Sequence, residues 1–191
     1  MVGHLPTPTR GTIGGSLAHA DPAAEYPCVV AALEGELVLQ SGRRQRVVAA
    51  ADFFQGLMST AIRPDELLIE IRLPAVAGDA GWAFEEFSVR RGDFALAGIA
   101  AMLRRQNGRC RAVRLAACAA GPAPVRLRRA ESIMEGGGAD DHTIEEAAKA
   151  AAQEVEPAGD IHASADFRRH LVHVLTRRAL RRAIAQSGQR L

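Results

Sequence analysis

The sequence predicts an α+β fold in which a small antiparallel sheet is covered by helices. Two observations favour this class. Segments with strand-like patterns lie between residues 36 and 118 and are joined mostly by short turns that contain glycine; turns of this kind join antiparallel strands. Helical patterns fill most of the chain after residue 124, so these helices are segregated from the sheet that they cover.

The first 75 residues are expected to hold a short helix, a hairpin and a strand. A dense run of small and apolar residues predicts a buried helix over residues 23–33. Two apolar runs around Ser41 and Gly42 predict a β-hairpin over residues 36–50. The segment 65–74 alternates in polarity and ends in proline, which predicts a half-buried strand. Its alternating apolar residues are Leu67, Ile69, Ile71 and Leu73.

Small residues and glycines in the segment 75–81 predict a boundary between two domains, 1–75 and 76–191. Two strands are expected within residues 82–105, with a kink at Arg91-Gly92-Asp93, and a third within 110–121. The second domain is therefore expected to contain a three-stranded antiparallel sheet with helices on it.

Three helices are expected in the last third of the chain. The first covers residues 124–137 and stops at glycines. The second opens with Thr143 and Glu146 at capping-box spacing. The third begins near Ser164 and is amphipathic. Its expected apolar face holds Phe167, Leu171, Val174 and Leu175, and its expected polar face holds His170, His173, Arg177 and Arg181.

The composition excludes several classes of protein. Hydrophobic residues make up 48% of the chain and charged residues 24%, with a net charge of +2, as in an ordinary globular protein. Aromatic residues are only 4%, which disfavours a nucleic-acid groove. No apolar run is long enough to span a membrane and no leader pattern is present, so a cytoplasmic location is expected. The spacing of Cys28, Cys110 and Cys118 favours reduced thiols over a disulfide or an iron–sulfur site.

The adjacent glycines Gly14 and Gly15 are the first candidate for a ligand site. Glycines let successive backbone N–H groups point at one ligand, and Thr12 and Ser16 add hydroxyl groups. A tight loop with a helix cap explains the same residues without a ligand. The spacing does not fit the dinucleotide or phosphate-loop fingerprints.

Carboxylates and histidines supply the weaker candidates. The side chains of Asp21 and Glu25 bracket the start of the first expected helix, where they could accept hydrogen bonds from ribityl or ribose hydroxyls. The pair His170 and His173 is expected to be solvated rather than to bind a metal. His19 is expected to bond its own backbone. The arginine pairs 168/169, 177/178 and 181/182 are also expected to be solvated, with contact to a partner subunit as the alternative.

The string RGTIGGSLAHADPAAE, residues 10–25, strongly resembles the second flavin-binding signature of a known subunit. This is the FAD-binding medium subunit of the molybdenum hydroxylase family, which includes bacterial carbon monoxide and xanthine dehydrogenases. Later landmarks of that subunit occur here in the same order, and the resemblance covers essentially the whole chain. They are DELLIEIRLP, FEEFSVRRGDFALAGIA and DIHASADFRRHLVHVLTRRAL.

The resemblance implies that FAD is the cofactor and that several residues contact it. The residues implied to face the flavin are Thr12, Ile13, Gly14, Gly15 and Ser16. Glu25 stands where many relatives carry aspartate, and Leu68 is implied to lie near the isoalloxazine ring. Glu86 stands where some relatives carry lysine, which reverses the charge at that position. No catalytic acid or base and no metal ligand is expected on this chain.

The resemblance also implies partners and a division of labour. A large molybdopterin subunit is implied to oxidise the substrate, and a small iron–sulfur subunit to pass electrons to the FAD of this subunit. The first glycine-rich signature of the family is not found in this sequence, so poor FAD retention by the isolated chain and an apolar patch beside Gly14 and Gly15 are expected. The alternatives are a truncated, non-catalytic remnant or assembly module that does not retain FAD, and an unrelated module that binds a small ligand.

Overall fold

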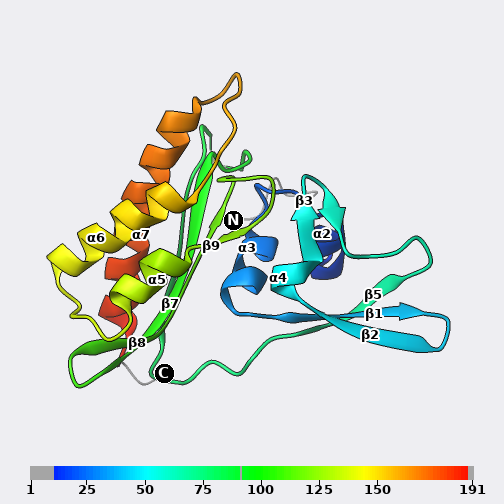
Figure 1. The fold of residues 1–191 in the computed structure, drawn as a ribbon, viewed down its shortest axis with the longest axis horizontal. Helices are drawn as coiled ribbons and strands as arrows, with labels where there is room; N and C mark the ends of the chain where they lie inside the picture. The colour runs from blue at the N-terminus through cyan, green and yellow to red at the C-terminus, as the bar shows by residue number, and fades with distance from the viewer. Residues whose placement is uncertain (1–10, 91, 189–191) are drawn as a thin grey trace.

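The computed structural model describes residues 11–90 and 92–188 and shows a three-stranded sheet, a four-stranded sheet and a separate pair of short strands, with helices around them (Figure 1). Helices and strands alternate in the first half, and helices dominate the end of the chain. In chain order the elements are α2 (Ile13–His19), α3 (Glu25–Ala32), β1 (Glu36–Ser41), β2 (Arg44–Ala49), α4 (Ala50–Phe53), β3 (Phe54–Gly56), β4 (Ser59–Thr60), β5 (Leu67–Arg72), β6 (Gly81–Phe87), β7 (Ala97–Gln106), β8 (Arg109–Cys118), β9 (Val125–Arg126), α5 (Arg128–Met134), α6 (Asp141–Glu154) and α7 (Ala165–Gln186). The expected α+β class is confirmed.

The first sheet has the strand order β2-β1-β5, and all of its pairs are antiparallel. Strands β1 and β2 form the expected hairpin, whose closing pair is Ser41 and Arg44. Gly42 occupies the turn at φ +56°, a left-handed conformation that glycine adopts without strain. Strands β3 and β4 pair separately beside this sheet.

Strand β5 forms where the sequence predicts it, but of its four expected alternating residues only Ile71 packs against the first core. The side chains of Leu67, Ile69 and Leu73 are 73%, 46% and 49% exposed, and it is Leu68 and Ile71 that pack against the first core. The pairing with β1 shifts register between Val38 and Leu39. A bulge of this kind breaks the strict two-residue alternation on which the expectation rested.

The second sheet has four antiparallel strands in the order β6-β7-β8-β9, rather than the expected three. The extra strand β9 pairs Val125 and Arg126 with the end of β8. Because these two residues are extended, α5 begins at Arg128 and not at residue 124. Strands β6 and β7 flank the expected kink, of which Arg91 lies outside the described residues.

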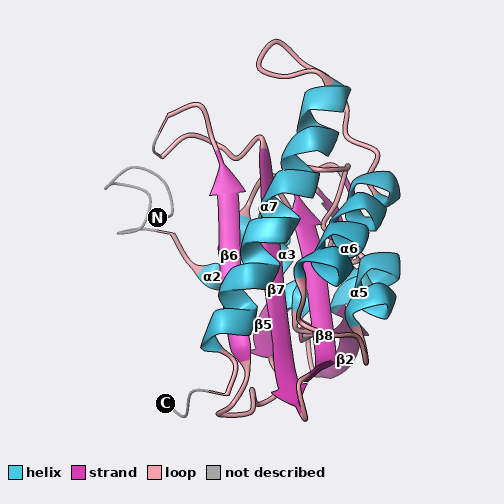
Figure 2. Cartoon of the chain, turned by 90° about the vertical axis from the view of Figure 1, so that its left-hand side faces the viewer, coloured by secondary structure: helices cyan, strands magenta, loops and turns pink. Residues whose placement is uncertain are grey.

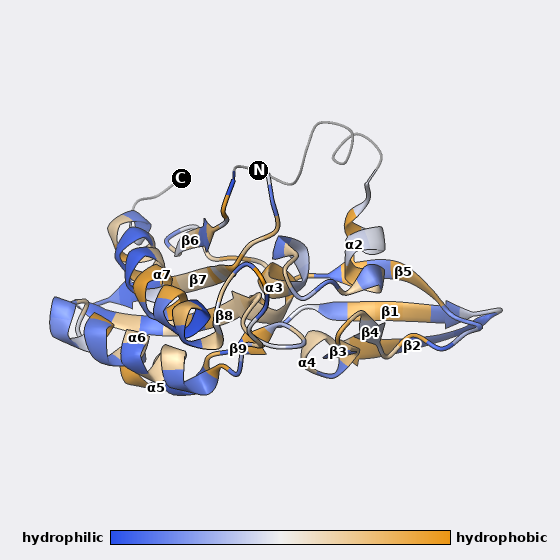
Figure 3. Ribbon diagram, turned by 90° about the horizontal axis from the view of Figure 1, so that it is seen from above, coloured by the Kyte–Doolittle hydropathy of each residue, from blue (hydrophilic) through white to orange (hydrophobic). Residues whose placement is uncertain are grey.

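Helices α5, α6 and α7 cover one face of the second sheet, and α3 covers the other (Figure 2). The main core lies between this sheet and the three helices, and Leu103, Leu115, Met134, Leu175 and Leu180 are fully buried there. Figure 3 shows that the outer side of α6 is mostly hydrophilic. Within the described ranges, none of the helices is both long and apolar enough to cross a membrane.

Two helix starts test the expected caps. Helix α7 begins at Ala165, next to Ser164 as expected, and Ser164 caps it, because its side chain accepts a hydrogen bond from the Phe167 N–H. Helix α6 begins earlier than expected, since its cap is Asp140 and not Thr143. The Asp140 carboxylate accepts from the N–H and from the hydroxyl of Thr143, and this lowers the pKa of Asp140. Glu146 pairs with Lys149 instead of closing a capping box.

Candidate functional site

The glycine pair of the signature lies in the first turn of α2 and not in a loop. Thr12 caps this helix, and its Oγ1 accepts a hydrogen bond from the Gly15 N–H at 2.9 Å. Neither Gly14 nor Gly15 has a positive φ. The alternative of a helix cap is therefore confirmed, because a capping threonine lets the backbone turn helical immediately after it, and ligand binding by the N–H groups of this turn stays a prediction.

The two glycines differ in the space around them. A Cβ atom at Gly15 would lie 2.9 Å from Thr12 Oγ1, whereas a Cβ at Gly14 would meet no atom within 4 Å. Ile13, in the same turn, is 51% exposed, and Ser16 is half-buried. Gly14 therefore leaves its backbone open to close approach by another molecule, and Gly15 serves the helix cap.

The two carboxylates that follow α2 are not equivalent. Asp21 Oδ1 accepts a hydrogen bond from the Ala23 N–H at 2.8 Å, which stabilises the turn before α3. Glu25 is the first residue of α3 and is half-buried. The pKa of Glu86 on β6 is raised, first by the burial of its carboxyl group and then by repulsion from the Glu25 carboxylate.

Gly98 on β7 pairs with Glu86 on β6 at one side and with Cys118 on β8 at the other. A Cβ at Gly98 would lie 2.6 Å from Cys118 Sγ, so the thiol fills the space that glycine leaves. Cys118 and Cys28 are both fully buried between the second sheet and α3. Their contact and their burial raise the pKa of Cys118 well above its ordinary value. All three cysteines are free thiols, as expected.

Leu68 lies on the core side of β5. Its side chain is half-buried and packs against the first core, while its neighbours Leu67 and Ile69 are exposed. Its expected position near the isoalloxazine ring stays a prediction.

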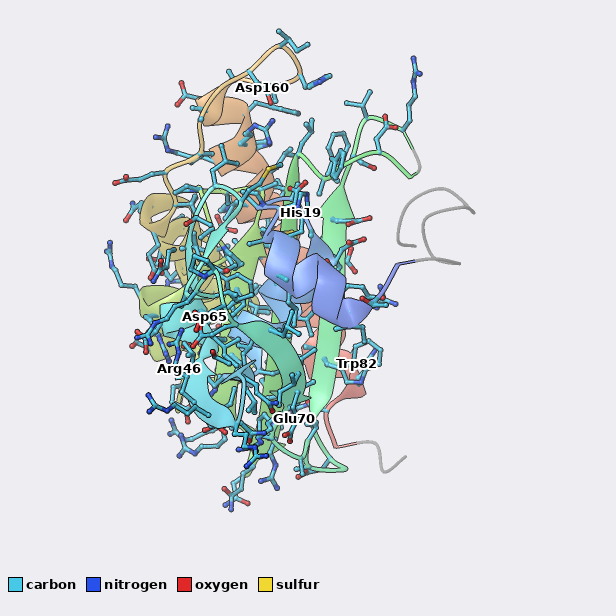
Figure 4. The ribbon with its side chains drawn as sticks, turned by 90° about the vertical axis from the view of Figure 1, so that its right-hand side faces the viewer. His19, Arg46, Asp65, Glu70, Trp82 and Asp160 are labelled. Carbon is cyan, nitrogen blue, oxygen red and sulfur yellow. The ribbon has the colours of Figure 1, made fainter. Side chains whose placement is uncertain are left out.

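The candidate histidines differ in their surroundings. His19 is exposed at the end of α2 (Figure 4). The expected solvation of the pair on α7 holds for His170, which is exposed, but was wrong for His173, which is half-buried with its Nε2 3.0 Å from Glu145 Oε1. Among the described residues, no group of three His, Cys, Asp or Glu side chains is placed to hold a metal ion.

The expectation that the arginines of α7 are solvated was wrong for Arg168, but it holds for Arg181 and Arg182, whose side chains are 47% and 60% exposed although they form ion pairs. Arg168 is buried, where it donates to the Leu96 carbonyl and to Asp160. Three others pair with residues of neighbouring elements: Arg177 with Glu145, Arg181 with Asp141 and Arg182 with Glu85. The buried face of α7 is accordingly turned from the expected one, and Phe167 is 43% exposed.

A cluster of charges at the end of α3 was missed by the sequence reasoning. The carboxylate of Glu34 lies 2.9 Å from Arg114, 3.3 Å from Arg126 and 3.2 Å from Arg128. Arg126 also binds the buried Glu131 at 2.7 Å. A cavity of about 340 Å³ adjoins this cluster. Only the separation of these residues along the chain, 80 or more positions, hid the cluster from a sequence reading.

Family comparisons cover both parts of the chain. Residues 2–76 match the family described as FAD binding domain in molybdopterin dehydrogenase. Residues 82–183 match the family described as CO dehydrogenase flavoprotein C-terminal domain.

Individual relatives agree with these families. The chain is 35% identical to the 6-hydroxypseudooxynicotine dehydrogenase complex subunit alpha of Paenarthrobacter nicotinovorans, over 96% of this chain and 62% of that protein. Its fold is similar to carbon monoxide dehydrogenase from Hydrogenophaga pseudoflava, with TM-score 0.95, 34% identity and coverage of 97% of this chain and 65% of that one. It is also similar to quinoline 2-oxidoreductase from Pseudomonas putida 86, with TM-score 0.92, 37% identity and coverage of 98% and 65%. The chain thus spans a little under two thirds of the length of these relatives.

Proposed function

Because the chain belongs to the family of FAD-binding medium subunits of molybdopterin dehydrogenases, we propose that it is the flavin subunit of a multi-subunit oxidoreductase. The ordered match of both family regions carries this proposal. FAD is the cofactor of the domain that residues 2–76 match. When bound, it supplies the redox chemistry that lets a flavoprotein accept and release electrons.

The proposed site lies over the first turn of α2. Gly14 offers an open backbone surface, a feature that a larger residue would fill. Ile13 is exposed beside it, and the Ser16 hydroxyl is half-buried in the same helix. Thr12 and Gly15 shape this turn through their hydrogen bond. These residues therefore fit a bulky cofactor that packs against the helix.

Other cofactor contacts are proposed beyond this turn. Asp21 and Glu25 would accept hydrogen bonds from hydroxyl groups of the cofactor, and Leu68 would support the ring from the first sheet. Glu86 would place a carboxyl where some relatives carry lysine. No residue of this chain is proposed as a catalytic acid or base.

The partners and the location belong to the same proposal. Electrons would come from iron–sulfur clusters on a small subunit and leave to an external acceptor, and the substrate would react at a molybdenum cofactor on a large subunit. The complex would be cytoplasmic, and the division of this chain into domains 1–75 and 76–191 is proposed as well.

Titration of the purified chain with FAD, followed by flavin fluorescence and absorption, tests the proposal. We expect weak FAD binding, in line with the poor retention expected from the sequence, and Gly14→Ala should weaken it further by about tenfold or more, a change of about 1.4 kcal/mol. Gly78→Ala is the matched control, since a Cβ there also meets nothing within 4 Å. Equal FAD affinity in both variants would contradict the site over α2. A folded chain that binds no FAD would favour an assembly module instead.

A further inference from the structure

Helix α3 joins the two parts of the molecule. The first part comprises α2, α4 and strands β1 to β5, and the second part comprises strands β6 to β9 and helices α5 to α7. On one side Val30 of α3 enters the first core, and on another Cys28 and Ala32 pack against β7 and β8. Among the described elements, α3 makes most of the contacts between the two parts.

The chain leaves α3 through a tight turn at Glu34 and Gly35. The Gly35 N–H donates to the Val30 carbonyl and the Glu34 N–H to the Ala31 carbonyl, which is the Schellman pattern of a helix end. A Cβ at Gly35 would lie 2.9 Å from Leu73 Cδ2. The segment that leaves α3 and the segment that leaves β5 therefore lie against each other at Gly35 and Leu73.

Glu34 occupies the position of this turn that favours glycine. Its φ is +55°, a left-handed conformation that an L side chain rarely adopts. Its carboxylate explains why a glutamate stands there, since it binds Arg114, Arg126 and Arg128, from β8, β9 and α5 of the second part. Burial alone would raise the pKa of Glu34, but these arginines outweigh it and lower the pKa, so the carboxylate is ionised at neutral pH.

The cavity lies at the same junction and is lined from both parts. Gly35, Ala50 and Phe54 line one side, and Pro124 and Arg126 line the other. Close packing is therefore interrupted where the parts face each other. Besides the packing of α3, the ion pairs of Glu34 are among the contacts that join the parts at this junction.

We propose that Glu34 is a positioning residue that holds the part carrying α2 at one angle to the sheet carrying Glu86. The proposed flavin contacts are divided between these parts, so a fixed angle keeps the flavin site preformed. The claim that the flavin site is preformed rests on the proposed function. The claim that Glu34 fixes the angle between the parts does not depend on it.

The distance between the parts tests the proposal. Spin labels at Arg43→Cys, on the hairpin tip, and Gln153→Cys, on α6, report it, and the three native cysteines are shielded by burial. With Glu34 present, we expect one narrow distance distribution. Glu34→Ala should broaden or shift it, and so should Glu34→Gly, although glycine relieves the backbone strain.

Two further variants make the distance measurement decisive. Glu70→Ala is the control, because it removes an ion pair with Arg72 inside β5 that does not join the parts. If Glu34→Ala does not fold, Glu34→Gln keeps the size of the side chain and removes its charge. Distributions in the Glu34 variants that match the wild type at equal urea midpoints would overturn the proposal.

FAD affinity gives a second readout. If the angle is no longer fixed, only a fraction of molecules is competent to bind, and the apparent affinity falls roughly five- to tenfold in Glu34→Ala. Altered distances with unchanged FAD affinity would overturn the positioning role. If the chain with Glu34 intact binds no FAD, the proposed function fails for this chain, while the distances still decide whether Glu34 holds the angle.

Discussion

Replacing Gly81 by alanine is expected to disrupt the contact between β6 and α7. A Cβ at Gly81 would lie 1.8 Å from the Ala183 carbonyl oxygen and 2.7 Å from the Ser187 nitrogen. Ordinary contacts between heavy atoms are about 3.5 Å, so α7 or β6 must move by roughly 1.5 Å. Both neighbours are backbone atoms that no rotamer change can remove. Overpacking in a core costs about 1–3 kcal/mol, and we expect the upper end of that range.

Urea and thermal unfolding measure this cost. Trp82, the only tryptophan, adjoins Gly81, so its fluorescence follows β6 directly. A loss of about 3 kcal/mol corresponds to a fall in Tm of about 6–12 °C for a chain of this size. Gly78→Ala, with open space around its Cβ, should stay within about 0.5 kcal/mol of the wild type or gain stability. A Gly81→Ala protein as stable as Gly78→Ala would refute the steric reasoning.

Three other predictions address charges and caps. Glu131→Gln breaks the buried pair with Arg126 and should cost about 3–5 kcal/mol in urea unfolding, and a loss below about 1 kcal/mol would show that the pair is replaceable. The hydrogen bond from Arg46 lowers the pKa of Glu66 to about 2, so its stabilisation is present above pH 4.5 and is lost as the pH falls toward 2. Glu66→Gln should therefore lose stability at neutral pH and depend less on pH across this window, and an unchanged acid profile contradicts this. Asp140→Ala should lower the free energy of unfolding by about 1 kcal/mol in calorimetry, and no change would mean that Asp140 is dispensable as the cap of α6.

Elements that depend on local chemistry were predictable from the sequence. The hairpin follows from Gly42 in a two-residue turn, and the start of α7 follows from Ser164. Strand β9 was not predictable, because Val125 and Arg126 are extended only through pairing with β8. The cap of α6 was misplaced because Asp140 and Thr143 are both good capping residues three positions apart.

In the candidate site, too, local features were predictable from the sequence and features that depend on tertiary contacts were not. The resemblance located the signature, but a helix cap at Thr12 made its glycines helical. The bulge in the pairing of β5 moved Leu68 to the core side of the strand, which alternation alone could not reveal. The partners of Glu34 come from three later elements, so its role depends on tertiary structure.

Strand β5 has a consequence for the handling of this chain. It forms one border of the first sheet among the described strands, and its exposed side chains include Leu67 and Ile69. A border strand with apolar side chains and unpaired backbone groups is a template on which a second molecule can add a strand. Self-association in concentrated solution is therefore expected to begin at β5. The substitution Ile69→Lys, which adds a charge to this strand, should suppress it.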